Sequence, residues 1–114
     1  MLTMPKLKGF ERTYLRGLAH NLKPVVQIGK SGITDEVTAS INEALAAREL
    51  IKIKFIDFKE EKKAISKEIE ENTKSEMVGM IGNIAIFFRE HADYAKRKIR
   101  LPQKGKPREL RKSK

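Results

Sequence analysis

The chain has 114 residues, no cysteine and a formal net charge of +10. This length suits one domain with its own core and a short tail, and the lack of cysteine excludes disulfide bonds and thiolate metal sites. The first sixteen residues contain five charged side chains and no long apolar run, which is unlike a signal peptide or a membrane span, so we expect a cytoplasmic protein.

The charge is distributed unevenly along the chain. The net charge is +5 over residues 1–33, −3 over residues 34–92 and +8 over residues 93–114. Such an asymmetry favours a directed surface for a polyanion over a uniform solubilising charge. The acidic middle leaves an alternative open, in which this region contacts a basic protein partner through Glu60, Glu61, Glu68, Glu70 and Glu71.

Residues 7–21 have the periodicity of an amphipathic helix, with apolar side chains recurring on one side from Leu7 to Leu22. Lys8, Arg12 and Arg16 follow one another at steps of four, and His20 continues the series. Residues four apart lie on one helix face, so these side chains predict a basic ridge. The ridge is either a solvated face or a surface for phosphates, and the sequence favours neither.

A short strand is predicted over residues 25–28, with Pro24 as its first residue, where no ladder donor is needed. It runs directly into Gly29-Lys30-Ser31-Gly32. Glycines permit positive φ and a close approach of an anion, and the N–H groups of such a turn converge on phosphate oxygens. The Lys30 ammonium and the Ser31 hydroxyl would add two donors at the tip.

The spacing of these glycines is weak support by itself, because it recurs in Gly79-Met80-Ile81-Gly82, which we interpret as structural. The end of the motif also matches the phosphate-binding loop of nucleotide hydrolases, but that loop needs a glycine where this chain has Pro24. What distinguishes residues 29–32 is the basic, polar tip between a strand and a helix.

Thr34 is predicted to cap a helix that ends near Arg48. Asp35 and Glu36 in its first turn offset the helix dipole and disfavour a phosphate directly on the helix end. Residues 50–55 alternate between apolar and charged side chains, which predicts a strand with one buried and one wet face.

A third helix is predicted over residues 59–73, followed by strands at 77–81 and 84–88. Gly82-Asn83 between these strands is typical of a type II′ hairpin turn. The resulting order, α-β-α-β-α-β-β, predicts an α/β fold of the two-layer α+β type, with three helices and a four-stranded mixed sheet. Right-handed crossovers would place the second and third helices on one face. The alternation along residues 50–55 indicates that the opposite face is at least partly open.

We interpret residues 1–92 as a single domain and residues 93–114 as a basic, flexible arm. Two prolines and a glycine in the arm prevent a long amphipathic helix. Basic arms of this kind commonly follow phosphates and become ordered when bound. The arm therefore contributes Lys96, Arg97, Lys98 and Arg100 as candidate contacts.

Four ordered blocks, at residues 15–20, 22–34, 49–54 and 81–89, resemble the CRM domain family (chloroplast RNA splicing and ribosome maturation) in its bacterial, single-domain, YhbY-like form. The resemblance covers about residues 7–90. It implies an RNA-binding domain similar to the C-terminal domain of translation initiation factor three, with residues 29–32 as the RNA-contacting loop. It also implies association with precursors of the large ribosomal subunit, as in bacterial members of the family.

Together, these features predict a non-catalytic RNA-binding protein of large-subunit assembly, with ribosomal RNA and possible ribosomal proteins as partners. We expect no cofactor, metal, membrane or small-molecule substrate, because His20 and His91 lack metal-ligand spacing. A general nucleic-acid-binding protein remains an alternative, since phosphate contacts do not separate RNA from DNA. The candidate RNA contacts are Gly29, Lys30, Ser31, Gly32, Lys8, Arg12, Arg16, Lys23, Arg89, Lys96, Arg97, Lys98 and Arg100.

The aromatic residues influence the expected mode of recognition. Phe10, Tyr14, Phe55, Phe87 and Phe88 are better explained as core residues than as a surface for bases. We therefore expect the shape and phosphates of a structured RNA to dominate recognition over base stacking.

Overall fold

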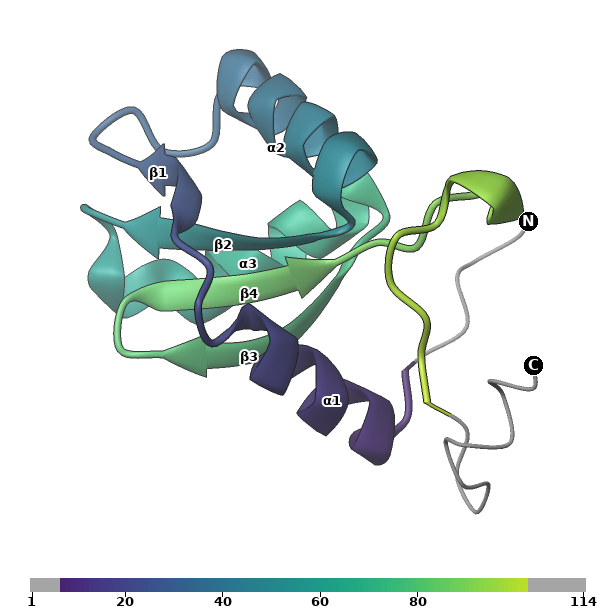
Figure 1. The fold of residues 1–114 in the computed structure, drawn as a ribbon. Helices are drawn as coiled ribbons and strands as arrows, with labels where there is room; N and C mark the ends of the chain where they lie inside the picture. The colour runs from purple at the N-terminus through teal and green to yellow at the C-terminus, as the bar shows by residue number, and fades with distance from the viewer. Residues whose placement is uncertain (1–6, 103–114) are drawn as a thin grey trace, which may run out of the picture.

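The computed structural model describes residues 7–102, and its helices and strands follow the predicted order (Figure 1). The helices are α1 (Gly9–Ala19), α2 (Asp35–Arg48) and α3 (Lys62–Thr73), with short 3-10 turns η1 (Lys59–Glu61) and η2 (Tyr94–Lys96). The strands are β1 (Pro24–Ile28), β2 (Leu50–Phe55), β3 (Glu76–Ile81) and β4 (Ile84–Phe88). The α+β fold with a mixed sheet is thus confirmed for the described residues.

Local signals set several of these boundaries. Pro24 is the first residue of β1, and Thr34 caps α2 by accepting the Val37 N–H at 3.1 Å. The turn between β3 and β4 contains Gly82 with a φ of +60°, while Asn83 has no positive φ. This pattern fits the predicted type II′ turn, because a type I′ turn needs positive φ at both central positions.

The strand order in the sheet is β1-β2-β4-β3. β1 and β2 are parallel, whereas β4 is antiparallel to both β2 and β3. Four consecutive residues of β4, from Ala85 to Phe88, are buried. A strand that is apolar on both faces needs cover on both, and β4 contributes Ala85 and Phe87 to one core cluster and Ile86 and Phe88 to the other.

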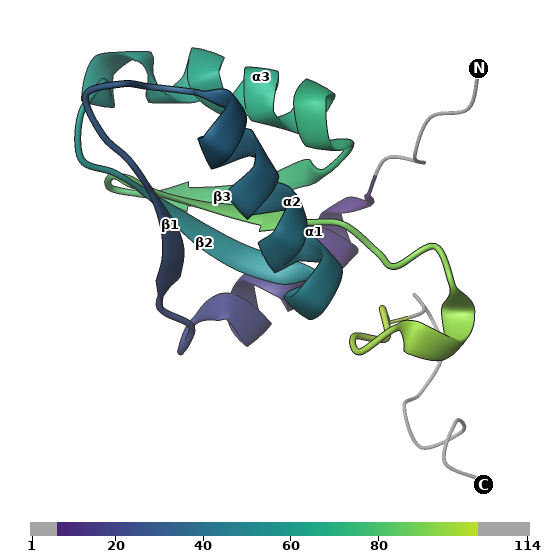
Figure 2. The same cartoon turned by 90° about the horizontal axis from the view of Figure 1, so that it is seen from above.

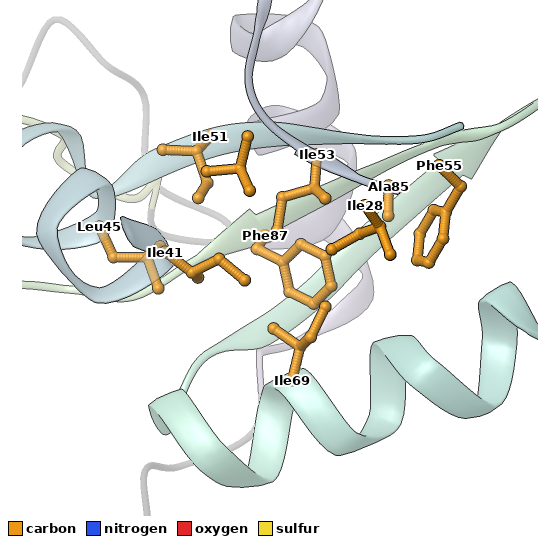
Figure 3. Close-up of a cluster of buried hydrophobic side chains, with 10 residues drawn as sticks. Ile28, Ile41, Leu45, Ile51, Ile53, Phe55, Ile69, Ala85 and Phe87 are labelled. Carbon is orange, nitrogen blue, oxygen red and sulfur yellow. The ribbon is translucent and has the colours of Figure 1, made fainter. Parts of the chain in front are cut away.

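The main core lies between the sheet and the helices α2 and α3 (Figure 3). Ile41 and Leu45 of α2 and Ile69 of α3 pack there against Phe87 and the other buried residues of the sheet. The two helices therefore lie on the same face, as the right-handed crossovers predict.

α1 packs on the opposite face of the sheet (Figure 2), where Leu15 and Ala19 contact Leu50, Ile86 and Phe88. This helix adds a third, partial layer to the two predicted layers. Its amphipathic stripe is what covers the second face. No helix within residues 7–102 is long and apolar enough to cross a membrane.

Candidate nucleic-acid interface

Residues 29–32 form a tight turn directly after β1. The Gly32 N–H donates to the Gly29 carbonyl at 2.9 Å, which closes a four-residue turn with Lys30 and Ser31 at its central positions. Both central residues are exposed, and Lys30 forms no hydrogen bond or ion pair with any residue from 7 to 102. The turn thus presents an ammonium and a hydroxyl to the solvent at its tip.

The two glycines of this turn have different roles. Gly32 has a φ of +67°, in the left-handed region that favours glycine, and a Cβ there would make only an ordinary contact, 3.5 Å from Cε2 of Phe58. Gly29 has no positive φ, and a Cβ there would meet no atom within 4 Å. The backbone therefore favours glycine at position 32, whereas glycine at position 29 leaves the approach to the turn open.

The helix dipole at the N-terminus of α2, which follows the turn, is already offset by groups of the protein. The Thr34 hydroxyl caps it, and Asp35 and Glu36 occupy its first turn. Carboxylates at a helix N-terminus offset the dipole and repel an approaching anion. An anion bound at this end must therefore use the turn itself.

Three connections meet at the end of the sheet that carries the turn (Figure 1). The Ile28 carbonyl accepts the N–H groups of Ile56 at 2.9 Å and Asp57 at 3.1 Å, which ties the connection after β2 to the base of the turn. The Asn83 carbonyl of the β3–β4 hairpin accepts the Phe55 N–H at 2.8 Å. The glycine turn is thus held on a hydrogen-bonded base.

Lys54 is an additional cation at this end of the sheet. Side chains alternate along β2, so Lys54 lies on the same face as Leu50, which packs against α1. Lys54 is exposed and pairs in the ladder with Gln27, two residues before the turn. Its position at the wet end of an alternating strand, beside the turn, is the sequence signal that could have identified it.

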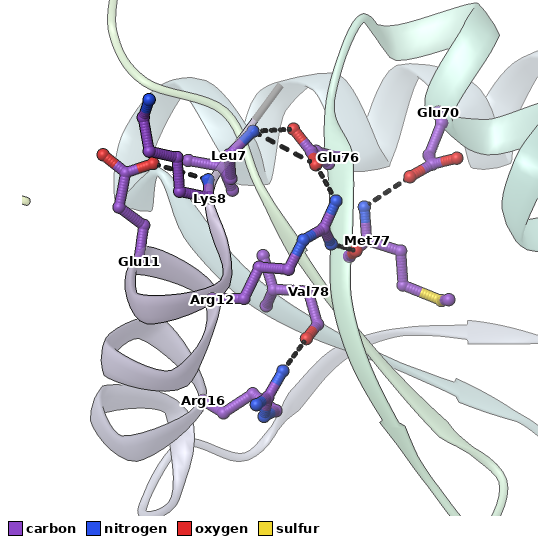
Figure 4. Close-up of polar contacts among 9 residues, drawn as sticks. All are labelled: Leu7, Lys8, Glu11, Arg12, Arg16, Glu70, Glu76, Met77 and Val78. Atoms are coloured by element: carbon purple, nitrogen blue, oxygen red, sulfur yellow. Dashed lines mark hydrogen bonds and ion pairs between the residues drawn. The ribbon is translucent and has the colours of Figure 1, made fainter. Parts of the chain in front are cut away.

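Two arginines of the basic ridge of α1, Arg12 and Arg16, reach the edge strand β3 with their guanidinium groups (Figure 4). Arg12 pairs with the Glu76 carboxylate, and its Nη1 donates to the Met77 carbonyl at 2.7 Å. Arg16 Nη1 donates to the Val78 carbonyl at 2.8 Å. These two guanidinium groups hold α1 against the sheet, and the charge of Arg12 is already neutralised.

Arg89 also makes contacts inside the molecule. Its Nη1 donates to the Asn42 side-chain oxygen at 2.7 Å and to the Thr73 carbonyl at 2.8 Å, and its Nη2 donates to the Asn42 carbonyl at 3.1 Å. Burial lowers the pKa of the guanidinium below its ordinary value. Arg89 thus links α2 to the C-terminal end of α3.

Residues 91–101 pack against the domain. Glu49 is only 1% exposed. Its carboxylate accepts hydrogen bonds from the N–H groups of His91 at 2.7 Å, Lys98 at 2.8 Å and Ile99 at 2.9 Å. Ile99 and Leu101 pack against the core cluster beneath α1. The first part of the predicted arm is therefore docked through Glu49, whereas residues 103–114 lie outside the described part of the chain.

The docked segment carries its own group of cations. The guanidinium carbons of Arg97 and Arg100 lie 5.1 and 5.8 Å from the ring centre of Tyr94, a distance that allows cation–π attraction. Arg97 is also paired with Glu90 at 3.5 Å. Lys96 and Lys98 are exposed and border a cavity of about 460 Å³ beside the C-terminal end of α2.

The predicted contacts therefore fall on separate parts of the surface. β1 and β3 are the two edges of the sheet, so the glycine turn and the Arg12–Arg16 seam lie at opposite edges. Lys98 and Ile99 bind Glu49, which precedes β2, so residues 96–100 lie at the end of β2 away from the turn. Lys23 is exposed just before β1 and lies at the same sheet edge as the turn, whereas the exposed Lys8 is the N-cap of α1.

The aromatic residues assigned to the core are buried or half-buried, but Phe58 and Tyr94 are 40% and 65% exposed. No pattern in the sequence marked either residue as exposed.

No group of three or more potential metal ligands from His, Asp and Glu occurs within residues 7–102. The chemistry available at the turn is thus hydrogen-bond donation and positive charge.

The fold and the glycine turn agree with the comparisons with known proteins. The family model of the CRS1 / YhbY (CRM) domain matches residues 7–89, which include the turn and the whole sheet. The chain belongs to the CRM domain family. The match ends at Arg89, so the segment that docks on Glu49 lies beyond the matched part of this CRM domain.

Two relatives match this CRM domain over nearly their whole length. A Haemophilus influenzae protein named "RNA-binding protein" is 39% identical over 102 residues, which are 89% of this chain and 100% of the relative. The Bacillus subtilis "Probable RNA-binding protein YqeI" is 35% identical over 97 residues, 84% of this chain and 99% of the relative. The solution structure of the hypothetical protein SAV1595 from Staphylococcus aureus is 38% identical, covers 85% of this chain and 100% of that chain, and has a TM-score of 0.73.

Proposed function

We propose that this CRM domain is a non-catalytic, cytoplasmic RNA-binding protein that acts in the assembly of the large ribosomal subunit. The observation that carries this proposal is the exposed turn at residues 29–32, whose Lys30 has no partner among residues 7–102. Ammonium, hydroxyl and backbone N–H groups are donors that position a phosphate without reading sequence. The relatives named as RNA-binding proteins support RNA as the polyanion.

The surface that we assign to the RNA follows the β1 edge of the sheet. Lys23 lies before β1, Lys30 lies in the turn after it, and Lys54 lies beside it on β2, all three exposed. Each ammonium can neutralise a phosphate without first breaking an internal contact. Arg12 and Arg89 would have to break hydrogen bonds inside the protein before they could bind a phosphate. We therefore assign both residues a structural role.

Lys96 and Lys98 form a second contact region at the other end of β2. The six residues of β2 span about 20 Å at the usual rise per residue. A structured RNA is large enough to reach both ends, and the charge of +8 over residues 93–114 would then add to the affinity. The role in large-subunit assembly is supported by the resemblance to the bacterial single-domain members of the family.

The test is crosslinking and sequencing of RNA bound in cells, for the wild type and for variants of the turn. Gly29→Asp and Lys30→Glu should remove a footprint on large-subunit ribosomal RNA, because each places negative charge where the phosphate binds. Lys67→Glu is the matched control, with the same charge change at an exposed position of α3. An unchanged footprint in both turn variants would contradict a binding role for the turn.

Two further measurements separate the alternatives. After RNase treatment, the protein should leave its ribosomal precursors, whereas a protein-interaction adaptor would stay bound. At fixed salt, structured RNA should compete better than DNA of the same length. Equal competition by DNA would contradict the RNA assignment, and a footprint on other RNAs alone would contradict the role in large-subunit assembly.

A further inference from the structure

Phe58 is an exposed aromatic residue beside the glycine turn. A Cβ built on Gly32 would lie 3.5 Å from Cε2 and 3.8 Å from Cζ of the Phe58 ring, so the edge of the ring abuts the turn. The residue is 40% exposed and belongs to neither core cluster. Its ring is therefore partly available to a ligand that also contacts the turn.

The backbone of Phe58 is in an uncommon conformation. Its φ and ψ are 58° and 39°, the left-handed region, which is unfavourable for a bulky side chain and is usually occupied by glycine or asparagine. Strained residues of this kind concentrate at ligand sites. Core packing does not explain a phenylalanine here, because the side chain contributes to neither core cluster.

The backbone that carries the Phe58 ring is tied to the base of the turn. The Ile28 carbonyl accepts the N–H groups of Ile56 and Asp57, so the two residues before Phe58 are tied to the residue before Gly29. The Phe58 carbonyl accepts the Glu61 N–H at 3.1 Å, which holds the chain on the other side. Ring and turn thus form one surface rather than two independent loops.

The charges around this surface give it a direction. Lys30 and Ser31 lie on the turn side, whereas residues 57–61, which include Phe58, carry a net charge of −2 from Asp57, Glu60, Glu61 and one cation, Lys59. A phosphate is favoured near Lys30 and disfavoured near the carboxylates, while an uncharged planar base is compatible with the aromatic side. A nucleotide fits this arrangement with its phosphate on the turn and its base on the ring.

We propose that Phe58 stacks on an unpaired base of the RNA whose phosphate is bound by residues 29–32. This inference rests on the proposed function and adds a base contact to it. Stacking on an aromatic ring tolerates any base, because every base has a π-face, but it requires a base that is not buried in a duplex. The protein then prefers RNA with an unpaired nucleotide over a continuous duplex.

The test is fluorescence anisotropy with two labelled RNAs that share one stem: a hairpin with an unpaired loop, and a blunt duplex. Phe58→Leu keeps an apolar side chain but lacks an aromatic face, so it should bind the hairpin about tenfold more weakly, within the range typical of one base–aromatic stack. Binding to the duplex should not change. Phe58→Tyr should bind the hairpin like the wild type.

A tryptophan reports stacking directly, because the chain contains none. The fluorescence of Phe58→Trp should be quenched when the hairpin binds. Ile81→Trp is the matched control, since Ile81 is 67% exposed on β3, the edge of the sheet opposite β1, and its tryptophan should not be quenched. Phe58→Asn places a residue that tolerates the left-handed backbone, so it should remain folded yet lose the preference for the hairpin.

The outcomes separate this inference from the proposed function. If Lys30→Glu weakens binding of both RNAs while Phe58→Leu weakens neither, the stacking proposal is wrong, and the phosphate-binding role of the turn is supported. If Phe58→Leu weakens both RNAs equally, Phe58 supports the turn rather than a base, and the inference is also wrong. If neither variant changes any affinity, the turn does not bind RNA and both proposals fail.

Discussion

The aliphatic stem of Arg16 fills the space that a side chain at Gly79 would need. A Cβ at position 79 would lie 2.7 Å from Cδ and 3.1 Å from Cγ of Arg16. The guanidinium beyond this stem donates to the neighbouring Val78 carbonyl. The second GxxG sequence of the chain is thus structural, as its apolar centre predicts, and its first glycine provides room for α1 on the sheet.

This contact predicts that Gly79→Ala lowers the free energy of unfolding by about 1–2 kcal/mol, because Arg16 must move and lose its bond to the sheet. Urea denaturation measures the change. In an Arg16→Ala background the same alanine should cost close to nothing. An equal cost in both backgrounds would mean that the two side chains do not compete for this space.

The two glycines of the exposed turn should separate stability from binding. Gly32→Ala forces a Cβ into the left-handed region and should cost about 1 kcal/mol or slightly more. Gly29→Ala should leave the melting temperature near that of the wild type, yet weaken RNA binding, because its methyl group narrows the approach to the turn. Thermal unfolding and RNA titration of both variants provide the check. A large loss of stability in Gly29→Ala would contradict the assignment.

The docking of residues 91–101 on Glu49 predicts that a chain ending at residue 92 is less stable than one ending at residue 102. The shorter chain leaves the buried Glu49 carboxylate without the Lys98 and Ile99 donors and removes two apolar contacts, a loss of about 2 kcal/mol or more. Thermal unfolding of both chains measures it. Equal melting temperatures would support the boundary at residue 92 expected from composition.

Hydrogen exchange tests the same docking in the full chain. Glu49→Gln should speed the exchange of the Lys98 and Ile99 amides, because the amide side chain is a weaker acceptor than the carboxylate. Glu90→Gln, which removes only the partly exposed pair with Arg97, should change these rates little.

Salt dependence should identify which cations meet phosphates. If about five phosphates are neutralised, the logarithm of the affinity should fall with the logarithm of salt concentration at a slope of roughly −4. Lys30→Gln should reduce the magnitude of this slope by about one. Arg12→Gln should leave the slope unchanged and lower stability, because Arg12 already pairs with Glu76. A slope near zero for the wild type would exclude the electrostatic mechanism.

Much of the fold could be predicted because its determinants are local. The Thr34 cap, the Pro24 start of β1, the alternation along β2 and the Gly82-Asn83 turn each depend on a few neighbouring residues. The insertion of β4 between β2 and β3 depends on pairings between distant strands. The cover of α1 on the second face likewise depends on long-range contacts, which local periodicity does not specify.

The candidate site was predictable to a similar degree. The turn and its Lys30 tip follow from adjacent residues. The positive charge of Arg12, Arg16 and Arg89 suggests phosphate contacts. In the fold, however, each donates a hydrogen bond to a backbone carbonyl more than 15 residues away in the chain. Phe58 had no sequence signal, since its importance arises from a left-handed backbone that phenylalanine does not predict.

The two hydrogen bonds accepted by the Ile28 carbonyl have a consequence for binding kinetics. They immobilise the stem of the turn before any ligand arrives, so association costs little loop entropy. A preorganised tip lets the encounter proceed at the rate set by diffusion and charge, and differences in affinity among RNAs then lie in how long each complex lasts. Discrimination by this domain would therefore be expressed as residence time.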